Sequence, residues 1–152
     1  MPPTDVDPVA ACDEQAECPE CGAPQSRLTC RARLELLLAW EVDDEALREL
    51  HFLTVASFNL QHPAAFIDQA RAGLEEAFRG YLDGQATIAD IRRRAAGVDG
   101  AVRIRRRSDE VRPQRRRWPV TIDAVAVPGQ PADAAARVRS WAEAIRDTLA
   151  GA

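Results

Sequence analysis

The sequence predicts a mainly helical fold, a small bundle of four to five helices with an N-terminal zinc knuckle. Apolar residues recur at three- and four-residue spacing through most of the chain, which is the helical period. All four cysteines fall within the first thirty residues. Residues 98–127 alternate with a period of two instead, and this predicts a short two-stranded β ribbon. At 152 residues the chain has the size of one domain.

Charge divides the chain into an acidic beginning and a basic later part. Residues 1–26 contain six acidic and no basic side chains, whereas residues 92–117 contain eleven arginines against three acidic residues. We expect residues 1–17 to form a flexible acidic leader. Residues 18–150 are then predicted to form a single zinc-stabilised domain that includes an Arg-rich connection at about 98–117.

The first two predicted helices form an antiparallel hairpin. One spans about 30–42 with Thr29 as its N-cap, and the other spans about 44–61 with Asp44 as its N-cap. Pro63 is expected to end the second helix, because the residue before a proline is disfavoured in the α region. The apolar positions of these helices include Leu34, Leu37, Leu38, Val42, Leu47, Leu50, Leu53, Val55, Phe58 and Leu60.

Two more helices are expected before the ribbon and one after it. They span about 63–82 and about 88–96, and the shorter one would be capped by Thr87 and ended by Gly97. The last helix is predicted to begin near Pro131, since proline suits a first helical position. Its apolar face comprises Ala135, Val138, Trp141, Ala142, Ile145 and Leu149. The ribbon would pair Val102 and Ile104 with Val120 and Ile122.

The strongest chemical signal is the run Cys18-Pro19-Glu20-Cys21-Gly22, followed by Cys30. A CxxC turn with a glycine directly after it lets two thiolates converge on one ion. Cys30 would open a helix, where the dipole favours a thiolate. In a reducing compartment such cysteines are metal ligands more often than disulfides. The pattern therefore predicts zinc, with a redox-active CxxC pair as the alternative.

The fourth ligand is expected to be His62, with His51 and Cys12 as alternatives. The first helix rises about 18 Å, and an antiparallel partner returns to the level of Cys30 after about twelve residues or slightly more. That position lies nearer His62 than His51. The two histidines are eleven residues apart, about 16 Å along a helix, so one ion cannot take both.

Residues 51–63, with the sequence HFLTVASFNLQHP, add a resemblance to these signals. Together with the CPECG run and Cys30, this segment resembles an uncharacterised bacterial family, domain of unknown function 5946. The segments 117–122 and 138–142 are similar to that family as well. Phe58 stands where the family usually has tyrosine. The resemblance implies no catalytic residue, because the family has no assigned activity.

The chain shows no sign of secretion or membrane insertion. Its first residues lack a basic and apolar signal region, and no window approaches the roughly 18 apolar residues of a membrane span. We therefore expect a cytoplasmic protein with no membrane partner.

Three functions remain open at this point. The first is a binding or regulatory module with a structural zinc, whose partner would be another protein or a second copy of the chain. The second is a nucleic-acid-binding module that uses the Arg-rich segment. The third is a metal-dependent enzyme that uses a face containing His51 and His62. The enzyme is least favoured, because no GxSxG, HExxH or phosphate-loop motif is present.

Overall fold

The computed structural model describes residues 16–25, 27–97 and 104–152. The predicted mainly helical class is confirmed, but these residues form seven α helices and one short 3₁₀ helix where four to five helices were expected. None of the described residues lies in a strand longer than an isolated bridge. The elements are α1 (Cys30–Trp40), α2 (Glu45–Arg48), α3 (His51–Gln61), η1 (Pro63–Ala65), α4 (Asp68–Leu82), α5 (Ile88–Ala96), α6 (Ile122–Val125) and α7 (Ala134–Ala150).

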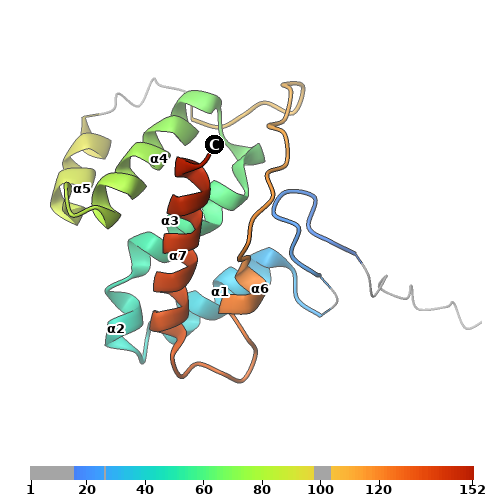
Figure 1. Cartoon of the computed structure of the whole chain (residues 1–152), viewed down its shortest axis with the longest axis vertical. Coiled ribbons are helices and arrows are strands. Elements are labelled where there is room, and N and C mark those ends of the chain that lie inside the picture. The colour runs from blue at the N-terminus through green and yellow to red at the C-terminus, as the bar shows by residue number, and fades with distance from the viewer. Residues whose placement is uncertain (1–15, 26, 98–103) are drawn as a thin grey trace, which may run out of the picture.

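Helices α3 and α7 form the centre of the molecule. Figure 1 shows α7 crossing the front with α3 behind it, α4 and α5 on one side, and α1 and α6 on the other. The predicted apolar face of α7 is confirmed, because Val138, Trp141 and Ile145 are completely buried. The face is a helical stripe, so it can pack on several neighbours at once. The stripe of α7 contacts α3 and α6, and the core lies between these three helices.

Helix α1 begins as predicted but its buried face differs. The Thr29 hydroxyl accepts a hydrogen bond from the Ala32 amide at 3.1 Å, which confirms the N-cap. The helix ends at Trp40, so Val42 falls outside it and is 72% exposed. Arg33 is buried instead, and its Nη1 donates to the Ala126 carbonyl at 3.2 Å. This contact with a residue far along the chain cannot be deduced from local spacing.

The predicted helix over 44–61 is divided in two. Asp44 caps α2 as expected, and Leu50 then leaves the helical conformation with φ −93° and ψ 10° before α3 begins. The guanidinium of Arg48 donates to the carbonyl of Val42 at 3.3 Å. That bond holds α2 against the preceding turn, and the chain changes direction before His51.

The predicted helix over 63–82 begins later than expected, at Asp68. Pro63–Ala65 form a 3₁₀ turn, and Phe66 is extended. The Ile67 amide donates to the Ile104 carbonyl at 2.9 Å, and the Arg106 amide donates to the Ala65 carbonyl at 3.0 Å. Backbone groups that would have opened a helix are thus paired with a distant segment.

The predicted β ribbon is wrong where it can be compared with the structure. Val102 lies outside the described residues, and Ile104 pairs with Ile67 rather than with Val120. Ile122 is fully buried because it begins the short helix α6, which packs on α1 and α7. The alternation around Val120 therefore marks the start of a helix, not a strand.

The remaining helices agree more closely with the sequence. Helix α5 has the predicted bounds, with a capping box between Thr87 and Asp90 and with Gly97 at its end. Helix α7 begins at Ala134, because Pro131 instead opens a turn in which the Ala134 amide donates to its carbonyl at 3.2 Å. No helix among the described residues is both long enough and apolar enough to cross a membrane.

Candidate metal centre

Three cysteines and one histidine converge beside the start of α1. The ligand atoms of Cys18, Cys21, Cys30 and His62 all lie within 4.8 Å of one another, and all four residues are buried. The Sγ atoms of Cys21 and Cys30 are 3.6 Å apart. Tetrahedral zinc with bonds of about 2.3 Å would separate two sulfurs by about 3.8 Å. These four side chains therefore form a cluster that could hold a metal ion.

The CxxC turn is closed by its own backbone. The Gly22 amide donates to the Cys18 carbonyl at 2.9 Å, and the Cys18 amide donates to the Ala23 carbonyl at 2.8 Å. Gly22 has φ +84°, a conformation that side chains rarely adopt. The Ala23 amide points at the Cys21 sulfur at 3.4 Å. The turn thus presents both sulfurs on one side and supplies a donor that favours a thiolate.

His62 is held in the tautomer that a metal ligand needs. A carbonyl only accepts hydrogen bonds, so the 2.7 Å contact with the Phe58 carbonyl places the proton on Nδ1 of His62. The ring also stacks on Phe58 with centroids 4.1 Å apart. Nε2 is buried and has no hydrogen-bond partner among the described residues. When His62 is neutral, the lone pair of Nε2 is therefore available to an ion, and the donor set fits zinc.

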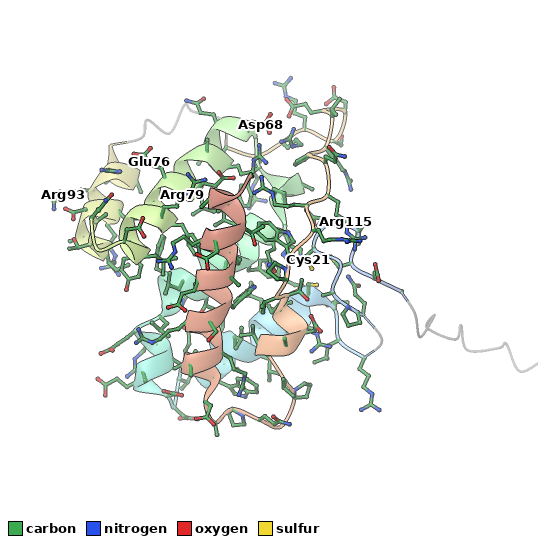
Figure 2. The ribbon with its side chains drawn as sticks, viewed as in Figure 1. Cys21, Asp68, Glu76, Arg79, Arg93 and Arg115 are labelled. Atoms are coloured by element: carbon green, nitrogen blue, oxygen red, sulfur yellow. The ribbon has the colours of Figure 1, made fainter. Side chains whose placement is uncertain are left out.

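Two contacts outside the cluster position the turn, and the sequence analysis missed both. The Glu20 carboxylate accepts a hydrogen bond from the Ala64 amide at 2.8 Å, which ties the turn to the residues that follow His62. Arg115 pairs with Glu17 at 3.1 Å, and a Cβ at Gly22 would lie 2.3 Å from its Nη2. Figure 2 shows Arg115 and Cys21 on the same side of the molecule. Glu20 stands between the two cysteines, but no signal in the sequence indicated Arg115.

The ionisable groups of the cluster shift the pKa values of one another. The hydrogen bond from Cys30 lowers the pKa of Cys21 to about 4 despite burial, and the same contact raises the pKa of Cys30. Burial alone would lower the pKa of His62, but the Cys21 sulfur and the Phe58 carbonyl favour the charged ring and raise the pKa to about 9. Without metal, the cluster therefore pairs a thiolate with an imidazolium near neutral pH.

Of the two alternative ligands, His51 can be compared with the structure, and it does not join the cluster. His51 begins α3, donates from Nδ1 to the buried Glu41 carboxylate at 2.8 Å, and has a side chain that is 60% exposed. Cys12 lies outside the described residues. Gln61 is fully buried in the core, where it bonds to Trp141. The alternative of a metal-dependent enzyme needs a face that contains both histidines, whereas His51 pairs with Glu41 and His62 lies in the cluster.

Comparison with known proteins shows which family the chain belongs to. Residues 16–150 match the model of a family of unknown function, DUF5946. The chain belongs to this family. The matched region contains all four residues of the cluster and leaves out Cys12. No curated protein and no solved structure matches the chain. The resemblance seen in the sequence is confirmed, and DUF5946 brings no assigned activity.

Binding of a metal ion by the cluster is expected to strengthen as pH rises. The metal needs thiolates and a neutral imidazole, whereas in the metal-free cluster Cys30 keeps its proton and His62, with a pKa raised to about 9, keeps one as well. Binding should release at least these two protons, so log affinity should increase by at least about two per pH unit from roughly pH 6 to 8.

Above about pH 9 the slope should fall by about one, because metal-free His62 has then lost its proton. Competition titrations against a chelator of known affinity at several pH values measure this slope. An affinity that does not change with pH would contradict the assignment of these protons.

Proposed function

We propose that this chain is a zinc-stabilised helical module whose task is to bind a partner or ligand. The observation that carries the proposal is the buried cluster of three cysteines with His62, whose Nε2 lacks a hydrogen-bond partner among the described residues. Under this proposal Cys18, Cys21, Cys30 and His62 hold the ion. Zinc would join the N-terminal turn to α1 and to the end of α3.

The donor set supports a structural ion rather than a catalytic one. Zinc takes four ligands in structural sites, whereas catalytic sites keep a position open for water or substrate. Three thiolates and one imidazole fill all four positions. All three described cysteines are free thiols, which agrees with the reducing conditions of the cytoplasm that we propose as its location.

Several arginines of the basic segment already have protein partners, which weakens the nucleic-acid alternative. Arg106 is only 10% exposed and contacts Asp68 at 2.9 Å, and its Nε donates to the Phe66 carbonyl at 3.0 Å. Arg115 pairs with Glu17, a residue of the predicted acidic leader. Part of the positive charge thus holds the segment onto the domain, as expected for a connection within the single domain proposed over 18–150.

Elemental analysis and native mass spectrometry of the purified full chain test the proposal. We expect one zinc per chain, and we expect removal of the ion by a chelator to lower the melting temperature strongly, because binding free energy is folding free energy in such sites. A metal-free protein whose melting is unchanged by chelator would refute the zinc. Rapid formation of a Cys18–Cys21 disulfide in that protein would favour the redox alternative.

A further inference from the structure

A cavity of about 280 Å³ lies directly outside the candidate metal centre. Residues that flank the proposed ligands form one wall, namely Pro19 and Glu20 of the CxxC turn and Gln61 and Pro63 around His62. Helix α4 and the segment 112–118 form the other walls. Figure 1 shows that segment descending past the turn toward α6. The folded CxxC turn is therefore part of the cavity.

Four arginines line the cavity, namely Arg71 of α4 and Arg112, Arg115 and Arg116 of the segment 112–118. Nε of Arg71 and Nη1 of Arg116 are both buried, and neither has a hydrogen-bond partner among the described residues. A buried donor on a charged group is costly to leave unpaired. Arg112 also lines the cavity and has an exposed side chain. These guanidinium groups come from two different elements and meet at one hollow.

The carboxylates at the cavity do not satisfy these donors. Glu20 accepts the hydrogen bond from the Ala64 amide, and Glu75 pairs with Arg79 on its own helix at 3.5 Å. Arg71 itself reaches Asp68 only at 3.7 Å, through Nη2 rather than through Nε. Arg116 lies over the Trp118 ring, 5.6 Å from the centroid, which fixes its direction. The hollow thus keeps an excess of positive donors.

We propose that this cavity binds the phosphate group of a small phosphorylated molecule, with Arg71, Arg112 and Arg116 as its ligands. Guanidinium groups present planar forks of donors that match phosphate oxygens, and such charge-assisted bonds are the strong ones. The apolar walls at Leu60 and Leu149 would contact the organic part. This inference rests on the proposed function and deepens it, because it names the ligand class of the binding module.

A small phosphate ester fits better than a nucleic acid strand. A strand is bound by a groove or surface that follows many phosphates. The arginines proposed as ligands line one cavity of about 280 Å³, just below the typical ligand-pocket volume of roughly 300–1,000 Å³. Arg105, Arg107 and Arg117 are exposed in the basic segment 92–117 and do not line the cavity. They serve as the comparison for surface binding.

Calorimetric titration of the zinc-loaded full chain with inorganic phosphate, at constant ionic strength, tests the inference. We expect saturable binding of one phosphate per chain, weakened about tenfold or more by Arg71→Gln and by Arg116→Gln. Arg139→Gln is the matched control, because Arg139 is exposed on α7 and distant from the lining residues. Phenyl phosphate should bind more tightly than inorganic phosphate if an ester is the ligand.

Three results would overturn the phosphate site. They are the absence of saturable binding, an equal loss in Arg139→Gln, and tighter binding of a single-stranded oligonucleotide that depends on Arg105 and Arg107 but not on Arg71. Elemental analysis of the same samples keeps the two proposals apart. Phosphate binding by a folded chain without zinc would support the phosphate site and refute the proposed zinc site. A zinc-loaded chain that binds no phosphate would support the zinc site and refute the phosphate site.

Discussion

The His62→Ala variant is expected to bind zinc more than about a hundredfold more weakly than the unchanged chain. Loss of residues that merely orient a metal ligand already costs 10–100-fold in affinity, and we propose that His62 is a ligand itself. At a fixed free zinc concentration near 100 times the dissociation constant of the unchanged chain, a hundredfold loss of affinity removes about 2.3 of the roughly 2.7 kcal/mol that zinc contributes to stability. Competition against a chelator and thermal unfolding at fixed zinc measure both effects.

Two further variants separate ligation from packing. His62→Phe keeps an aromatic ring for the stack on Phe58 but has no lone pair, so it should lose zinc as His62→Ala does. His51→Ala breaks the contact with Glu41 and should keep its zinc. A His51→Ala protein that loses more metal than His62→Ala would contradict the ligand set, and so would a His62→Phe protein that retains zinc.

Local signals in the sequence predicted those parts of the fold that depend on neighbouring residues. Thr87 and Asp90 form their capping box within one helical turn, and the stripe around Trp141 is a property of one helix. Cys30 and His62 lie together as the sequence predicted, although the helix expected to return the chain from Asp44 to His62 is divided into α2 and α3. The family match was predictable from short motifs alone.

Contacts between distant segments account for the errors. Ile104 alternates with arginines as a strand would, but its carbonyl accepts a hydrogen bond from the Ile67 amide after η1. This pairing delays the start of α4, and the residues described from 104 onward form no ribbon with Val120. The sequence alone suggests that Arg33 is a surface residue of α1. In the structure its guanidinium donates to the Ala126 carbonyl, and the side chain is buried in the core. The position of Arg115 beside Gly22 depends in the same way on where segment 112–118 runs.

Trp141→Ala is expected to lower the free energy of unfolding by about 3–5 kcal/mol, as large aromatic truncations in cores do. Trp141 is completely buried on α7, and its Nε1 donates to Oε1 of Gln61 at 3.2 Å. A domain of this size has only about 5–15 kcal/mol in total, so the variant should be close to unfolding. Trp40→Ala is the control, because Trp40 is only partly buried at the end of α1 and should cost less.

The hydrogen bond of Trp141 can be separated from its volume by a double-mutant cycle. Gln61 is fully buried, and its Nε2 donates to the Val120 carbonyl at 2.7 Å, so this one side chain joins α3 to α7 and to the segment before α6. Trp141→Phe leaves Oε1 of Gln61 without a donor, which should add about 1–3 kcal/mol to the loss of volume. Gln61→Met removes the need for that donor, and the two changes together should cost less than the sum of the single changes.

Chemical denaturation at saturating zinc measures the cycle. Strict additivity of the two changes would show that the hydrogen bond between Trp141 and Gln61 does not couple the two helices energetically.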